Sequence, residues 1–147
     1  MENRYLFRAK RIDNGELIEG FLIFEKDRAF IAHRVCEVIH SYSKAGKEYG
    51  FGNFIEVDLS TICQCTGFSD EDGKKIFDGD IVGFIDCTST ENGYSEHYCM
   101  GRVLWDEETG SFQVTERLSA ESYEVLDGGC KVLGNMFDNP ELLEQEG

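Results

Sequence analysis

The N-terminal part of the chain alternates apolar and polar residues, a pattern typical of β-strands that bury one face. Residues 4–10 place apolar, mostly aromatic, residues on one face and mostly basic residues on the other. The dipeptide Asn14-Gly15 that follows is typical of a tight hairpin turn with two central residues at positive φ, so a return strand is predicted over residues 16–24. The turn sequence "EKDR" then leads into residues 29–33. The sequence therefore predicts an N-terminal meander of three strands.

The apolar spacing is less regular in the middle of the chain. Residues 31–42 fit one face of a helix and a strand equally well, and we expect strand and loop there. The three glycines of residues 43–53 predict a loop at the boundary between two lobes, and the polar residues 87–97 predict another loop. The sequence "DNPELLEQE" at residues 138–146 predicts a short C-terminal helix, because Pro140 suits the first helical position. Further strands are predicted at residues 54–62, 81–86, 98–105, 111–115 and 131–137.

The pattern as a whole predicts a mostly β protein with two lobes, residues 1–62 and residues 63–147. The short strands are spaced as in small barrels and sandwiches. Eleven Phe and six Tyr against one Pro agree with this fold class, since aromatic residues fit the surface of a sheet. We expect three aromatic residues of the second lobe to lie in its core: Trp105, Phe112 and Phe137.

Charge is distributed unevenly between the two lobes. Residues 1–62 carry nine Lys and Arg against ten Asp and Glu, a net charge of −1, whereas residues 63–147 carry five against nineteen, a net charge of −14. The second lobe is therefore expected to repel nucleic acid. The basic face of the first strand could instead contact phosphates, dock on the acidic half of a second copy, or simply protect an edge strand. The candidate partner-binding residues on it are Arg4, Arg8, Lys10 and Arg11.

The segment "TGFSDEDGKKIFDGDIV", residues 66–82, contains an acidic cluster that suggests a calcium-binding loop. With Gly73 at the sixth loop position, Phe68 and Gly79 occupy positions where carboxylates are needed, so the match fails at both ends. The segment instead predicts a turn at Gly73, followed by a strand that starts after a glycine turn. Two acidic side chains near its tip are expected to be exposed and to be candidate contacts for a cationic partner: Asp70 and Asp72.

The sequence predicts no catalytic, cofactor-binding or metal-binding residues. Cys63 and Cys65 are spaced too tightly for a usual zinc site, and the histidines are isolated. Six irregularly spaced cysteines without a secretory signal predict reduced thiols, most of them structural. The sequence contains no nucleophile elbow, no phosphate-binding glycine loop and no run of 18 apolar residues. We therefore expect a protein that is not an enzyme, needs no cofactor and does not enter a membrane.

Four segments identify a family resemblance, and they run in order along the chain: "FRA" at residues 7–9, "TGFSDEDGKKIFDGDIV" at 66–82, "GRVLWDEETGSF" at 101–112 and "VLGNMFDNPELL" at 132–143. In these segments the chain resembles the YopX family of small bacteriophage and prophage proteins. The resemblance implies a phage-derived protein in a bacterial cytoplasm, and it carries no catalytic or ligand residue. The strand start "GDIV" is similar to that of SH3-like barrels. The fold expected is therefore an N-terminal β meander packed on a C-terminal SH3-like small barrel, with a short C-terminal helix.

The absence of catalytic motifs and the uneven charge together favour a protein that works by association. We expect a phage or prophage accessory protein that forms a homo-oligomer or binds a host or phage protein. Two alternatives remain open. The basic first strand would suit a nucleic-acid-binding module, and the acidic second lobe would suit a mimic of nucleic acid that occupies a host protein.

Overall fold

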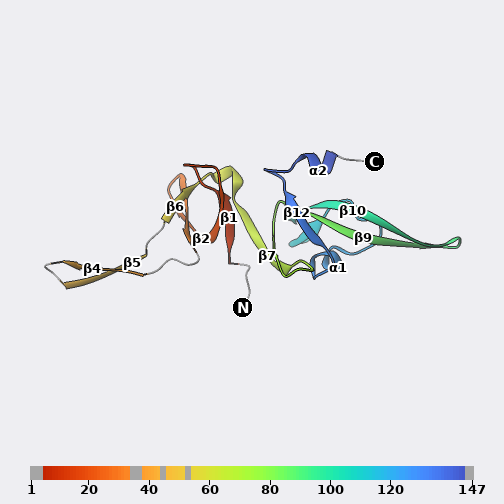
Figure 1. The fold of residues 1–147 in the computed structure, drawn as a ribbon, viewed down its shortest axis with the longest axis horizontal. Coiled ribbons are helices and arrows are strands. Elements are labelled where there is room, and N and C mark those ends of the chain that lie inside the picture. The colour runs from red at the N-terminus through yellow and green to blue at the C-terminus, as the bar shows by residue number, and fades with distance from the viewer. Residues whose placement is uncertain (1–4, 34–37, 44–45, 52–53, 145–147) are drawn as a thin grey trace. The chain divides into compact units, whose positions relative to one another are not determined.

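The computed structural model describes residues 5–33, 38–43, 46–51 and 54–144 of the chain (Figure 1). Most of these residues lie in antiparallel β-strands, and the helices are few and short, so the mostly β prediction is confirmed. The chain divides into two compact units, one of residues 4–64 and the other mainly of residues 65–147. The first unit contains most of a six-stranded sheet, whose last strands belong to the second unit, and the second unit also contains a four-stranded sheet. Each unit has its own cluster of buried apolar side chains.

The first unit contains the antiparallel meander that the sequence predicts. Its three strands are β1 (Phe7–Lys10), β2 (Leu17–Glu25) and β3 (Arg28–His33). Strand β6 (Phe54–Val57) pairs with the free side of β3, and β7 (Cys63–Ser69) pairs with β1 through its first two residues, after the short 3-10 helix η1 (Leu59–Thr61). Strand β1 is therefore an inner strand with a neighbour on each side, and the edge-strand interpretation of its basic residues is wrong.

Two local predictions in the first unit need correction. The first turn is not the tight turn predicted, because Gly15 has a positive φ, of 73°, but Asn14 does not. The Asn14 side chain accepts a hydrogen bond from the Glu16 N–H at 2.9 Å and so stabilises a longer loop. In the middle of the chain, β4 (Val38–Ser43) and β5 (Gly46–Phe51) form an antiparallel hairpin. The strand expected within residues 31–42 is present, but the loop expected over residues 43–53 is wrong where β5 lies.

The second unit is built on a four-stranded antiparallel sheet with the order β11-β10-β9-β12. Its elements are β8 (Lys75–Phe77), β9 (Asp80–Thr90), β10 (Gly93–Asp106), β11 (Ser111–Val114), α1 (Ser122–Leu126), β12 (Lys131–Asn135) and α2 (Glu141–Glu144). In the described part of the chain no pairing joins β11 to β12, so this sheet is not closed and the SH3-like barrel is not confirmed. The predicted C-terminal helix is present as α2. Helix α1 was not predicted, because its five residues are too few to show a helical period.

The core of the second unit lies between the sheet and α1. It consists of Ile76, Val82, Phe84, Val103, Val114, Val125, Leu126 and Cys130, with Phe112 and Val132 packed against it. Burial raises the pKa of the Cys130 thiol to about 12, so this thiol is an inert core group. Trp105 is 46% exposed and meets Phe112 edge to face at 5.0 Å between ring centroids. The prediction that Trp105 lies in the core is therefore wrong, since its strand has run past the edge of the core.

Strands β9 and β10 continue together beyond their neighbours as a two-stranded hairpin (Figure 1). The pairing of β12 with β9 ends at Gly83, whereas β10 pairs with β9 as far as the turn at residues 91–92. The term "arm" is used below for this extension, residues 84–102. The polar loop predicted over residues 87–97 is wrong, because nearly all of these residues are paired in the arm.

Position 101 of β10 requires a glycine, because the backbone that follows β11 passes very close to it. A Cβ atom at this position would collide with the carbonyl oxygen of Thr115 and lie 2.8 Å from Cγ1 of Val114. We expect Gly101→Ala to lower the free energy of unfolding by about 1 to 3 kcal/mol, because backbone and core must shift. Urea unfolding followed by Trp105 fluorescence measures this. The exposed Ser95→Ala on the same strand is the control, and equal stability of the two variants would contradict the prediction.

Candidate functional site

The arm has one face that belongs to the core and one that faces solvent. Side chains alternate along a strand, so Phe84 and Asp86 share one face while Ile85 and Cys87 share the other. Phe84 and Asp86 are buried, whereas Ile85 is 55% exposed. In the register of the hairpin, Ile85 lies directly opposite Tyr98, which is 62% exposed. The solvent face of the arm therefore carries large apolar side chains.

The side chains on this face are named here the outer stripe, which consists of Leu133, Tyr98, Ile85, Cys87 and Tyr94. Glu96 lies on the same face, opposite Cys87. Leu133 and Tyr98 both lie over Gly83, since a Cβ there would meet both side chains. At the distal end, the Tyr94 hydroxyl lies 2.8 Å from Cys87 Sγ and donates to Glu96 Oε1 at 3.1 Å. These two hydrogen bonds raise the pKa of Tyr94, and the one with Cys87 has the larger effect. The phenol therefore stays neutral. A row of exposed apolar and tyrosine side chains is typical of a protein contact surface.

On the buried face, the carboxylate of Asp86 holds the loop that precedes α1. It accepts hydrogen bonds from the backbone N–H groups of Leu118, Ser119 (2.9 Å) and Ala120 (3.1 Å), and from Ser119 Oγ (2.9 Å). Burial opposes ionisation of Asp86, but these donors outweigh it and hold its pKa well below the usual range. Asp86 is therefore an ionised structural anchor that links the arm to the loop.

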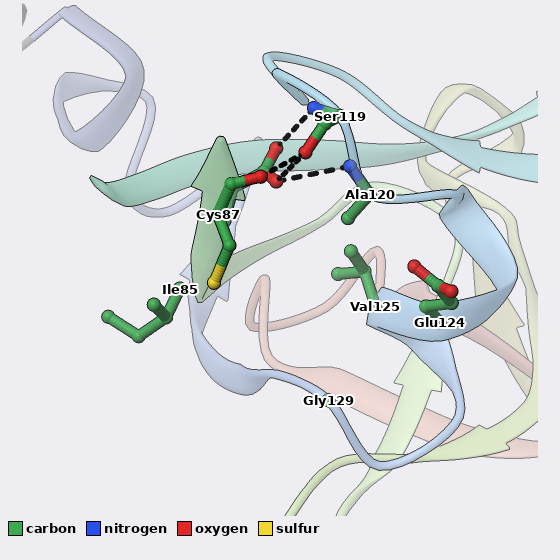
Figure 2. A pocket seen from close by; sticks show the side chains of 8 residues that line it. Ile85, Cys87, Ser119, Ala120, Glu124, Val125 and Gly129 are labelled. Carbon is green, nitrogen blue, oxygen red and sulfur yellow. Dashed lines mark hydrogen bonds between the residues drawn. The ribbon is translucent and has the colours of Figure 1, made fainter. Parts of the chain in front are cut away.

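A pocket of about 340 Å³ lies beside the arm, between β9 and α1 (Figure 2). Residues 85–87 of β9 form one wall, and Ser119 with Ala120 form another. Glu124 and Val125 of α1, with Gly129, complete the lining. The Ser119 hydroxyl also reaches the carbonyl oxygen of Cys87 at this wall. The pocket is of a size that can hold a side chain or a small ligand, and two carboxylates give it an acidic character.

The basic residues predicted to contact a partner are mostly engaged within the first unit. Arg11 forms a 2.7 Å ion pair with Asp13, and the hydrogen bond between them raises the pKa of Arg11 and lowers that of Asp13. Arg8 is half-buried and lies opposite Glu19 in the register of β1 and β2. Lys10 is also half-buried, and Arg4 lies outside the described residues. The structure therefore does not bring these residues together as an exposed cationic surface.

The acidic turn around Gly73 differs from the prediction in the burial of one carboxylate. Gly73 has a φ of 81° and the turn lies where the sequence predicts it, but Asp70 is buried rather than exposed. Its carboxylate accepts hydrogen bonds from the backbone N–H groups of Asp72 (2.9 Å), Lys74 (2.8 Å) and Val132 (3.0 Å). The expectation that Asp70 is exposed is therefore wrong, and its carboxylate has a structural role. Asp72 is exposed and lies 3.9 Å from Lys131 Nζ.

No group of three or more His, Cys, Asp and Glu side chains in the described part of the chain is arranged to hold a metal ion. No helix among these residues has the length and apolar character to cross a membrane. Cys63 and Cys65 are both buried in β7, which agrees with a structural role.

The outer stripe and the pocket were missed by sequence reasoning because residues 87–97 are polar enough to suggest a loop. One signal was present. Asn92-Gly93 is a typical hairpin dipeptide, and the alternation of Tyr94, Glu96 and Tyr98 after it indicates a strand. The role of Asp86 had no local signal, because its partners lie more than thirty residues away in the sequence.

Comparison with known proteins agrees with this architecture. A crystal structure of protein EF1440 from Enterococcus faecalis is similar over 93% of this chain and 96% of its own, with a TM-score of 0.59 and 23% sequence identity, which shows likeness of fold alone. No curated protein matches the chain. The family model described as YopX protein matches residues 6–144, nearly the whole sequence, as the resemblance implied. The chain therefore belongs to the YopX protein family.

Proposed function

We propose that this chain is a phage- or prophage-derived accessory protein that acts by binding another protein through the outer stripe of its arm. The observation that carries the proposal is the exposure of three large side chains on one face of a hairpin that extends beyond the sheet. Ile85 (55%) and Tyr98 (62%) lie directly opposite each other, and Tyr94 (64%) lies further along the same face. Tyrosine at such a place gives contact area with few rotatable bonds and a hydroxyl for hydrogen bonding.

The first unit offers weaker support for binding. Its exposed apolar residues Phe21 and Ile23 lie on the inner strand β2, and Phe54 lies on the short strand β6. The 2.6 Å ion pair of Arg28 with Glu56 lies beside them. Its basic residues are engaged, which counts against the docking of β1 on the acidic half of a second copy and against binding of nucleic acid. We therefore place the partner contact on the arm and take the partner to be a different protein.

A matched pair of substitutions tests the proposal. Tyr98 and Phe24 are both aromatic and both 62% exposed, but only Tyr98 lies in the outer stripe. A photo-reactive phenylalanine analogue at position 98 should give a protein adduct in cells of the natural host, and the same group at position 24 should not. With the adduct identified and purified, Tyr98→Lys should weaken its binding at least tenfold, because a charged side chain replaces the centre of the stripe. Phe24→Lys should leave binding unchanged.

Other outcomes decide against the proposal. Equal loss of binding by Tyr98→Lys and Phe24→Lys would contradict it, as would the absence of any adduct at position 98. An adduct with the mass of two copies, together with salt-sensitive dimers in light scattering, would show self-association instead.

A further inference from the structure

The arm leaves one side of β9 without a strand. On that side β12 pairs with residues 80–83. The residues before β12 form a turn that includes Gly128, whose φ is 80°, and they do not extend the strand. Strand β9 continues for seven more residues, 84–90, with β10 on its other side. In the part of the chain that the structure describes, no strand pairs with this edge. Edges of this kind usually carry Lys or Pro, and residues 84–90 contain neither.

The backbone groups of this edge point away from β10, and one of them, the Cys87 carbonyl oxygen, already accepts from Ser119 Oγ, so an added strand would have to share or displace that contact. Ser119 Oγ reaches the Cys87 carbonyl oxygen from the side of the pocket, so the backbone groups of Cys87 point away from β10. Backbone groups alternate in direction along an antiparallel strand, so those of Ile85 and Ser89 point the same way. A strand added here would lie beside β9 in line with β12. Its alternate side chains would extend the outer stripe on one face and enter the pocket on the other.

The net negative charge around this edge favours a positively charged partner segment. The arm, residues 84–102, and the segment 117–131 contain six acidic residues and three basic ones, Arg102, Arg117 and Lys131, a net charge of −3. Glu124 lines the pocket directly and is exposed. A second copy of the arm would bring like charges together, whereas a segment with Lys or Arg would complement them.

We propose that the open edge of β9 binds an extended, basic segment of a partner protein by β-strand addition, with one of its side chains in the pocket beside Glu124. The inference rests on the proposed function, since it names how the arm would recognise its partner. The inference assigns partner binding to the open edge of β9 and the pocket as well as to the outer stripe. Substitutions at the edge and in the pocket test it independently of Tyr98.

Random nine-residue peptides displayed on a carrier and selected against the full chain provide the probe. Selected peptides should contain at least two Lys or Arg and no interior Pro, and a synthetic copy should bind the purified protein. Cys87→Pro should weaken that binding at least tenfold, because it removes an N–H from the open edge without touching the pairing with β10. Cys87→Ala is the matched control, since it removes the same thiol but keeps the N–H.

A second pair of variants keeps the test decisive if Cys87→Pro folds poorly. Glu124→Gln removes the charge but can still accept from the Glu121 N–H, as Glu124 does at 3.2 Å, so α1 keeps its cap. It should weaken peptide binding about three- to tenfold, whereas the exposed Asp127→Asn, outside the pocket, should not. Enrichment of acidic peptides, no enrichment, or equal binding to Cys87→Pro and Cys87→Ala when both are folded would overturn the inference. If Tyr98→Lys abolishes partner binding while Cys87→Pro does not, the proposed function stands and the strand addition fails.

Discussion

Asp86→Asn is expected to lower the melting temperature of the second unit by roughly 5 to 10 °C. One buried carboxylate serves three backbone N–H groups and one hydroxyl of residues 118–120. An asparagine keeps a single acceptor oxygen and turns an N–H₂ group toward the same donors, so several of them lose their partner in a buried place. The loop should separate from β9, and amide hydrogen exchange at residues 118–120 should become faster.

The chain supplies both a probe and a control for this prediction. Its single tryptophan, Trp105, lies in β10, so fluorescence reports unfolding of the second unit specifically. Asp106 also accepts two hydrogen bonds, from Glu108 N–H and Thr109 Oγ1, but at an exposed turn. Asp106→Asn should change the melting temperature little. If Asp86→Asn melted within about 1 °C of the unsubstituted protein, its role as anchor would be refuted.

Asp70→Ala is expected to lower the free energy of unfolding by about 2 to 4 kcal/mol at pH 7, because three backbone donors from two parts of the chain lose their acceptor. The Val132 N–H belongs to β12, so the substitution loosens the contact between the acidic turn and the edge of the sheet. Asp72→Ala, two residues away and exposed, is the control. It should cost little, since its 3.9 Å contact with Lys131 is a solvent-exposed ion pair.

The pH dependence of this effect has a definite sign. Burial opposes ionisation of Asp70, but the N–H groups of Val132, Lys74 and Asp72 outweigh it and lower its pKa in the folded protein. The stabilisation is therefore complete above the pKa of the unfolded state, about 4, and is lost as the pH falls through the lower folded value. The stability gap between the unsubstituted protein and Asp70→Ala should narrow as the pH falls from about 5 to about 2. A gap that is constant over this range, by urea unfolding, would contradict the assignment.

The parts of the fold that could be predicted are those set by local patterns. The meander of β1 to β3, the turn at Gly73 and the short helix α2 each have a nearby signal in alternation, glycine or proline. The SH3-like barrel is not confirmed, because short strands at even spacing do not specify whether the last strand pairs with the first. Helix α1 is too short to show a period.

The candidate site was predicted less well than the fold, for a related reason. Asp70 and Asp86 look like surface carboxylates in the sequence, and only contacts far along the chain, to Val132 and to residues 118–120, make them internal. Composition suggested a basic site on β1, but β1 has a paired strand on each side and its Arg8 and Lys10 are half-buried. Arg11, which follows β1, forms an ion pair with Asp13. The edge of β9 is exposed because β12 ends its pairing at Gly83. The local sequence of β9 gives no sign of where β12 ends.

The central claim, that the arm is the contact surface, is tested most directly by amide hydrogen exchange of the full chain with and without the partner captured at position 98. Binding through the arm predicts slower exchange in residues 84–90 and 94–100, and unchanged exchange in β1 to β3. Protection confined to the first unit, with the arm exchanging as fast as in the unbound protein, would contradict it.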